Sequence, residues 1–154
     1  METRKPALNQ MDADNAIKLA KCFVDAWNPH DIEALMTMFH PQGILTIPAI
    51  PNPLSGDAMR GYLEAQMPAF PDIKAEAIGE TLVGSDTNSG RHLITGTWSK
   101  PMTTGPLAGI PPSGKSITLQ VADFLDVKVG KIGAWTQYYD RIALLTQLGI
   151  ISPK

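Results

Sequence analysis

The chain has 154 residues, 44% of them apolar and 18% charged, and a formal net charge of −2 at pH 7. This length predicts a single domain over residues 1–154, with a frayed polar segment over 1–12. The charge balance and the scattered basic residues argue against nucleic acid or an anionic membrane as a partner. A lone cysteine, Cys22, rules out an internal disulfide and suits a reducing compartment. Since no apolar run has the length of a signal peptide or a membrane span, we expect a cytoplasmic protein.

The first half of the chain predicts three helices and one strand. Apolar residues recur at helical spacing over 17–27, after a possible N-cap at Asp12 or Asp14. A short second helix over 32–39 follows the break at 28–31, and a strand over 43–47 ends at a run of prolines. A third helix then runs from Ser55 to Phe70, where Pro71 stops it.

In the second half the apolar period changes from helical spacing to alternation. Strands are predicted over 73–83, 91–100, 116–128 and 131–140, separated by turn-forming residues at 85–90, by a long loop at 101–115 and by Gly130. Asp140 is placed to cap a closing helix. Helices followed by strands in hairpin order indicate an α+β fold with a mostly antiparallel sheet. The length of the loop suggests a binding loop or a lid.

One carboxylate interrupts the apolar face of the predicted strand over 116–128, which has the clearest alternation in the chain. Alternation over 116–128 puts Asp123 on the same face as five apolar side chains, so it is drawn into the interior with them. A buried carboxylate without a partner is driven towards its neutral form, which suits a general acid or base. Alternatively, Asp123 accepts hydrogen bonds from its neighbours and has a structural role only.

Aromatic and polar side chains share the neighbouring strand faces. His92 and Trp98 lie on one face of the 91–100 strand, and Trp135, Gln137 and Tyr139 on one face of the 131–140 strand. If these faces point inward with Asp123, they line a small-molecule cavity that Trp27, Tyr62 and Met36 close from the helices. Core packing is the alternative explanation for each aromatic residue.

Several kinds of site are not indicated by the sequence. Nothing matches a phosphate loop, a dinucleotide fingerprint or a nucleophile elbow, and the three histidines lack metal-ligand spacing. We therefore expect no cofactor and no metal.

Seven short motifs, each weak alone, occur in a specific order from about residue 15 to 150. They are Asn28-Pro-His-Asp31, Ala69-Phe-Pro-Asp72, Thr95-Gly-Thr97, Gly109-Ile-Pro-Pro-Ser-Gly-Lys115, Val121-Ala-Asp123, Gly130-Lys-Ile132 and Gln147-Leu-Gly149. In this order they resemble the SnoaL-like polyketide cyclase family of the nuclear transport factor 2-like superfamily.

The resemblance implies a cone-shaped α+β barrel, in which N-terminal helices pack over the concave face of a curved sheet. It also implies a homodimer, for which the exposed sheet face is the natural surface. In cyclases that this chain resembles, the aspartate falling on Asp123 is the general acid/base of an intramolecular aldol closure, which needs no cofactor. The implied substrate is an apolar, polyketide-like small molecule of natural-product biosynthesis.

Two departures from the family pattern weaken the implied chemistry. Family members commonly have histidine where this chain has Trp98, and His92 is the possible substitute. Extra residues at 101–108 reshape the mouth of the pocket. The related limonene-epoxide-hydrolase-like branch needs an Asp-Arg-Asp set, one aspartate of which falls on Gln137, so we do not expect epoxide hydrolysis. Two further alternatives are a pericyclic-type cyclase that works by shaping its substrate and a non-catalytic binding module.

Overall fold

The computed structural model describes residues 10–153, with side chains from residue 13. It contains four helices, α1 (Gln10–Trp27), α2 (Ile32–Thr37), α3 (Gly56–Ala69) and α4 (Arg141–Gln147). The strands are β1 (Phe39–Thr46), β2 (Leu54–Ser55), β3 (Lys74–Val83), β4 (Thr87–Thr97), β5 (Ser116–Lys128) and β6 (Lys131–Tyr139). The α+β class expected from the sequence is confirmed.

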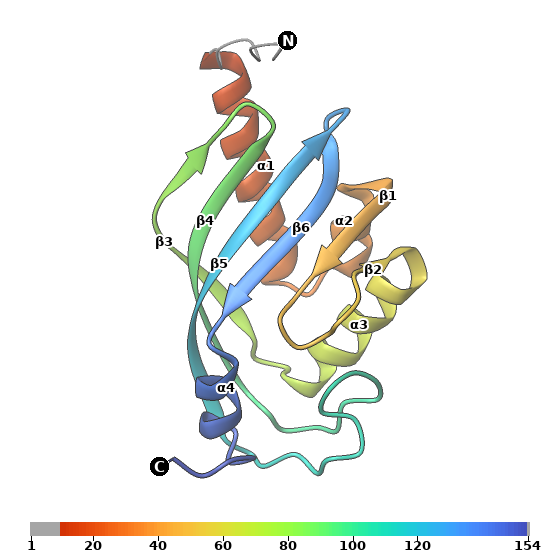
Figure 1. The fold of residues 1–154 in the computed structure, drawn as a ribbon, viewed down its shortest axis with the longest axis vertical. Helices are drawn as coiled ribbons and strands as arrows, with labels where there is room; N and C mark the ends of the chain where they lie inside the picture. Colours follow the sequence, from red (N-terminus) through yellow and green to blue (C-terminus); the bar gives the residue numbers. More distant parts are fainter. Residues whose placement is uncertain (1–9, 154) are drawn as a thin grey trace.

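One curved sheet organises the molecule (Figure 1). Its strand order is β2-β1-β6-β5-β4-β3, and every neighbouring pair is antiparallel except β1 and β6, which are parallel. Helix α1 crosses behind β4 and β5 in Figure 1, while α2 and α3 contact β1. The sheet stays open, with β2 and β3 at its two edges, and does not close into a barrel.

Several element boundaries differ from the sequence prediction. Residues 1–9, most of the segment predicted to fray, lie outside the described residues, as does the side chain of Asp12. Helix α1 begins at Gln10, so Asp14 lies inside the helix and does not cap it. Phe39 starts β1 and is not part of α2, and the two-residue strand β2 was not predicted. Strand β4 begins at Thr87, because the polar segment predicted as a turn pairs with both neighbouring strands.

Two of the family motifs hold the helical layer on the sheet. The side-chain amide of Asn28 donates to the backbone oxygen of Ala75 (3.0 Å) and its oxygen accepts from the Ala75 N–H (2.8 Å). Asp72 accepts from the backbone N–H of Thr97 (2.7 Å) and from its hydroxyl (2.9 Å). These motifs therefore fix where the chain after α1 and α3 meets the sheet.

A glycine and a glutamine from two other motifs also have structural roles. A Cβ on Gly96 would lie 3.2 Å from the Cα of Ile73, closer than ordinary contact, so the lack of a side chain favours the close approach of β4 to the residue that precedes β3. The Gln147 amide bridges the backbone N–H and oxygen of Thr118, at 2.7 and 3.1 Å, and attaches α4 to β5. Asp140 caps α4 as predicted, because its carboxylate accepts from the Ala143 N–H at 2.9 Å.

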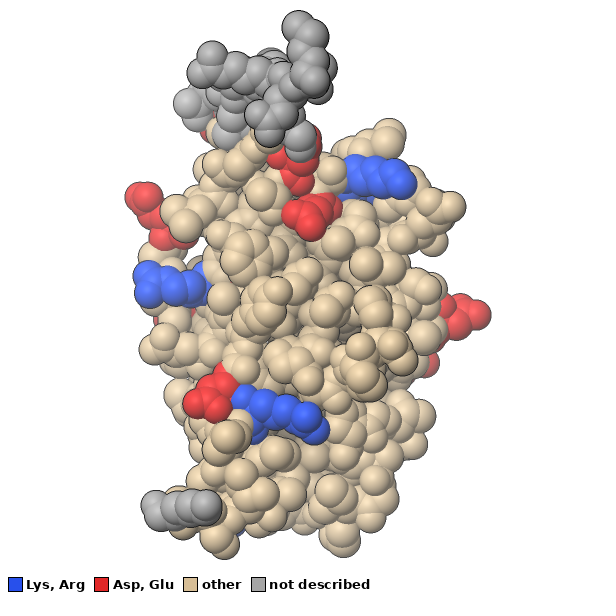
Figure 2. Space-filling view, viewed as in Figure 1, with Lys and Arg blue, Asp and Glu red and all other residues tan. Residues whose placement is uncertain are grey.

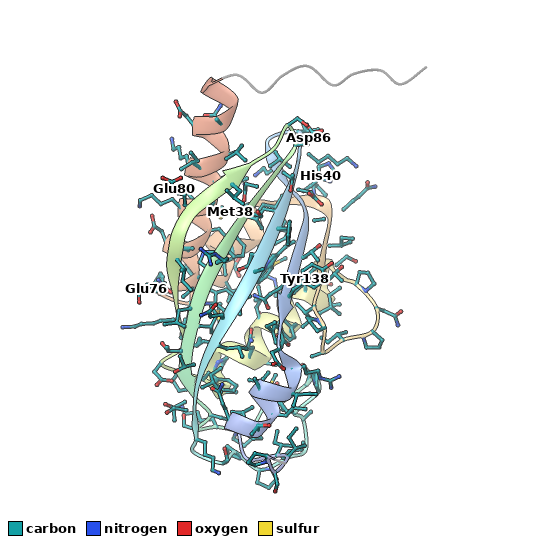
Figure 3. All side chains as sticks on the ribbon, turned by 60° about the vertical axis from the view of Figure 1, so that its left-hand side comes forward. Met38, His40, Glu76, Glu80, Asp86 and Tyr138 are labelled. Atoms are coloured by element: carbon teal, nitrogen blue, oxygen red, sulfur yellow. The ribbon has the colours of Figure 1, made fainter. Side chains whose placement is uncertain are left out.

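The face of the sheet away from the helices carries few charges. Figure 2 shows that charged side chains lie mostly towards the margins of this face. Phe124 and Tyr138 are exposed on it and form an edge-to-face pair with ring centroids 6.0 Å apart. By contrast, Glu76 and Glu80 project from the edge strand β3 (Figure 3), where charge opposes pairing with another strand. Within residues 10–153, no helix is both long and apolar enough to cross a bilayer.

Candidate functional site

Asp123 lies at the centre of three paired strands. The register sets it opposite Gly90 of β4 and opposite Gln137 of β6, on the face that the helices cover. It is 9% exposed, and Asn88 is the other buried residue with a polar side chain in the described part of the chain. The inward orientation inferred from strand alternation is thus what the structure has.

Three side chains donate hydrogen bonds to this carboxylate. The Trp135 Nε1–H (2.8 Å) and the Gln137 Nε2–H (3.1 Å) both contact Oδ1. His92 Nδ1 lies 2.9 Å from Oδ2. An ionised Asp123 accepts from all three groups, and this arrangement assigns the proton of a neutral His92 to Nδ1.

The two carboxylate oxygens are left in different situations. Oδ1 has two donors, which fill its two acceptor positions, whereas Oδ2 has one donor, His92. The remaining acceptor position of Oδ2 is therefore the place where Asp123 can take up a proton. Because three donors fix its orientation, this atom is held in place before any ligand arrives.

Aromatic packing keeps the Trp135 indole aimed at Asp123. Its ring forms edge-to-face contacts with Phe23 and Trp27, at centroid distances of 4.8 and 5.8 Å, and a tilted contact with Phe39 at 6.3 Å. Trp135 is 2% exposed, so the indole N–H has no access to water as an alternative acceptor. The donor position is consequently set by the packing between α1 and the sheet.

A largely apolar cavity of about 280 Å³ lies beside this cluster, between the sheet, α3, α4 and the 101–115 loop. Six of the lining residues have polar side-chain atoms, namely Trp27, Tyr62, Gln66, Gln137, Tyr139 and Arg141. The residues that line it are Trp27, Ala49, Tyr62, Gln66, Phe70, Ile73, Ile94, Met102, Pro106, Leu107, Ile110, Ile117, Leu119, Val121, Gln137, Tyr139, Arg141, Leu144, Leu145 and Ile150.

Asp123 adjoins this cavity but does not line it. Together with His92 it lines a separate space of about 20 Å³, which shares Trp27, Ile94 and Gln137 with the larger cavity. These three side chains form the partition between the two spaces. A ligand in the large cavity therefore approaches Asp123 at the partition, next to the Gln137 amide.

Several polar groups of the cavity wall have no protein partner in the described part of the chain. They include Trp27 Nε1 and Gln66 Oε1, which are buried. Burial raises the pKa of the Tyr62 hydroxyl well above its ordinary value, with a smaller contribution from Tyr139. Burial likewise raises the pKa of Tyr139, although the positive charge of Arg141 works in the opposite direction. Both phenols are thus neutral hydrogen-bonding groups at physiological pH.

The structure brings together most, but not all, of the residues predicted to form the site. Trp27, Tyr62, Gln137 and Tyr139 line the cavity, while His92 and Trp135 contact Asp123. Trp98 is 0% exposed and Met36 packs partly buried against the core, and neither lines the cavity. Trp98 lies one residue beyond the last paired residue of β4 and eight positions along the chain from Gly90, the residue that pairs with Asp123.

Sequence reasoning did not identify two polar residues of the cavity wall as site residues. Gln66 interrupts the apolar stripe of α3, in the same way that Asp123 interrupts the apolar face of β5. Arg141 directly follows the capping Asp140, and nothing in its sequence context indicates that it reaches a cavity.

A curved, open sheet covered by helices on one face, with an apolar cavity beside a buried carboxylate, defines an α+β fold of the class that the sequence predicted. The family model of the SnoaL-like polyketide cyclases matches residues 17–148. The chain therefore belongs to the SnoaL-like polyketide cyclase family, as its motifs predicted.

Solved structures share this fold at low sequence identity. AclR from Streptomyces galilaeus, provisionally named a hydroxylase, has a TM-score of 0.76 at 22% identity, covering 92% of this chain and 85% of its own. A protein from Jannaschia sp. CCS1, provisionally named a SnoaL-like polyketide cyclase, has a TM-score of 0.77 at 14% identity, with 100% of both chains covered. TsrD from Streptomyces laurentii has a TM-score of 0.73 at 22% identity, covering 94% and 99%. At these identities the likeness shows the fold alone. No curated protein sequence matches this chain.

Proposed function

We propose that this protein is a cofactor-independent cyclase or isomerase that closes a ring in an apolar, carbonyl-bearing, polyketide-like intermediate. Asp123 is the general acid/base in this proposal. The observation that carries it is the position of Asp123, because three donors hold the carboxylate beside an apolar cavity and leave one acceptor position open on Oδ2.

The proposed reaction is an intramolecular aldol closure. Oδ2 of Asp123 removes a proton from a carbon next to a carbonyl group, and the resulting enolate carbon bonds to a second carbonyl carbon of the same chain. The alkoxide formed on that second carbonyl takes the proton back from Asp123. No electrons are gained or lost overall, so acid–base chemistry is sufficient. A positioned group of this kind contributes roughly 10²–10⁴ in rate, or about 3–5 kcal/mol.

The polar groups near the partition have complementary roles. Trp27 lines both spaces and its buried Nε1–H has no protein acceptor, so it is placed to donate to a substrate carbonyl or enolate oxygen. Gln137 already donates to Oδ1 and orients the carboxylate. The apolar wall excludes water and holds a flexible chain in a ring-closing conformation, which supplies the rest of the acceleration.

The test compares Asp123→Asn with wild type in the cyclisation of a panel of polyketide-like substrates, each supplied as the free acid and as the methyl ester, followed by mass spectrometry and NMR. We expect the variant to lose at least 10²-fold in turnover while it binds these substrates as well as wild type does. Asp126→Asn is the matched control, since Asp126 is exposed on the opposite face of the same strand. Equal turnover by the Asp123 variant would rule out the proton-transfer role.

The two alternative functions give different results in the same assay. A cyclase that works by shaping its substrate keeps its turnover in Asp123→Asn, because the walls and not the carboxylate accelerate the reaction. A binding module closes no ring with either protein, and the substitution alters affinity alone. The apolar wall is compatible with both alternatives. The three hydrogen bonds to Asp123 also suit a purely structural carboxylate, and the support for general acid–base catalysis is the acceptor position that they leave open on Oδ2.

A homodimer through the open face of the sheet is the assembly we propose. The exposed Phe124–Tyr138 pair lies on a face whose centre carries few charges (Figure 2), as an interface requires. Sedimentation equilibrium of wild type and Tyr138→Asp tests this, and a monomeric wild type would exclude the dimer. The expected cytoplasmic location stays a prediction, with which the exposed thiol of Cys22 is consistent.

A further inference from the structure

Arg141 is the single charged residue among the described residues that line the large cavity. It is the first residue of α4 and lies two positions after Tyr139, which lines the same cavity. Its position follows from the path of the chain, because β6 ends at Tyr139 and the extended Asp140 joins it to the helix.

No carboxylate among the side chains described, those of residues 13–153, pairs with the Arg141 guanidinium. The neighbouring Asp140 is already engaged, because its side chain caps α4 through the Ala143 N–H. A cation beside an apolar wall and without a protein counter-ion is favourably placed for an anionic ligand.

Arg141 also marks the mouth of the cavity. An open groove of about 690 Å³ lies outside it, and the two spaces share Ala49, Tyr62, Pro106 and Arg141. The guanidinium and the Tyr62 side chain are therefore at the passage between the enclosed cavity and the surface. The Tyr139 side chain, which is close enough for the charge of Arg141 to influence its pKa, lines the cavity just inside.

We propose that Arg141 binds a carboxylate of the substrate, so that the natural ligand is a free carboxylic acid and not an ester. This inference rests on the proposed function, since it names the substrate class of the same cavity. A guanidinium matches a carboxylate with two parallel hydrogen bonds, and an ester offers no charge to it. The neutral phenols of Tyr62 and Tyr139 supply further donors at the same end.

The two ends of the cavity set the length of such a substrate. Gln137, beside Asp123, and Arg141 are four residues apart along extended chain, which corresponds to roughly 13 Å between their Cα atoms. With the carboxylate at Arg141, an apolar body on the order of 10 Å long reaches the partition where Asp123 acts. The cavity thereby orients the chain, with its acid group at the mouth and its reacting carbonyls inside.

The test needs no natural substrate. The probes are naphthalene-2-acetate and its methyl ester, and their affinities are measured by quenching of tryptophan fluorescence at low ionic strength. We expect wild type to bind the acid about tenfold more tightly than the ester, and Arg141→Met to bind both within about twofold of one another. Arg141→Lys keeps the charge without the forked geometry and should retain part of the preference.

Controls separate this inference from the proposed function. Arg91→Met removes an exposed cation from β4, which does not line the cavity, and should leave the preference unchanged. Added salt should reduce the preference in wild type and not in Arg141→Met. If wild type binds the acid and the ester equally, the carboxylate site is wrong while the cavity and the cyclase proposal stand. If neither probe binds, both this inference and the assignment of the cavity to a ligand are overturned.

Discussion

Replacing Asp123 by leucine or by asparagine gives the sharpest prediction for stability. Leucine removes every acceptor from the cluster, so the Trp135 and Gln137 donors are left unpaired, whereas His92 can adopt its other neutral tautomer. An unsatisfied buried donor costs about 1–3 kcal/mol. The unpaired Trp135 N–H accounts for most of this cost, because the residue is 2% exposed. The unpaired Gln137 amide costs less, because it can turn towards the cavity.

We therefore expect Asp123→Leu to lower the free energy of unfolding by about 3 kcal/mol, a large part of the 5–15 kcal/mol typical of a domain. Asparagine keeps an oxygen for Trp135 and Gln137 and presents its NH₂ to the other tautomer of His92, so Asp123→Asn should lose about 1 kcal/mol. Urea denaturation followed by tryptophan fluorescence measures both values. If the leucine variant were as stable as wild type, the three donors would have other partners, and the cluster would not be built around the carboxylate.

Two pH-dependent predictions concern groups at the edges of the site. The Thr97 N–H, together with its hydroxyl, holds the pKa of Asp72 below its ordinary value, so ionised Asp72 stabilises the fold above about pH 4 and the contribution is lost as pH falls through the depressed pKa. Urea denaturation should show Asp72→Asn less stable than wild type by about 0.5–1 kcal/mol at pH 7, a figure reduced for solvent screening of this exposed carboxylate, and the difference should shrink as pH falls below about 4. Burial raises the pKa values of Tyr62 and Tyr139, so their stabilising effect is complete below about pH 10 and declines above it. In Tyr138→Phe, which leaves these two tyrosines, ultraviolet titration should show no phenolate until well above pH 10; ionisation near pH 10 in the folded protein would contradict the burial of both hydroxyls.

The sequence predicted the fold class and the buried carboxylate because both depend on local periodicity. Alternation along β5 alone was sufficient to turn Asp123 inward. By contrast, the start of β4 was missed, since Ser89 and Gly90 have the composition of a turn although they pair with Phe124 and Asp123 of β5. Gly90 lies opposite the carboxylate, a placement that only the sheet register reveals.

The partners of Asp123 could be only partly anticipated. Strand faces brought Trp135, Gln137 and His92 towards it, but which of them donates to which oxygen depends on register and ring packing between α1 and the sheet. Trp98 was expected in the cavity because alternation was continued past the end of β4. Arg141 reaches the cavity because it lies at the junction of β6 and α4. Neither helical spacing nor strand alternation predicts the direction of a side chain at such a junction.

The most direct test of the central claim is proton exchange at a bound ligand. A 1,3-diketone that binds the cavity is incubated in D₂O, and incorporation of deuterium at a ketone's α-carbon is followed by NMR with wild type and with Asp123→Asn. If Asp123 is the base, wild type accelerates the exchange and the variant loses roughly 10²–10⁴ of that rate at unchanged affinity. Equal exchange rates for the two proteins would contradict the assignment of Asp123 as the acid/base group.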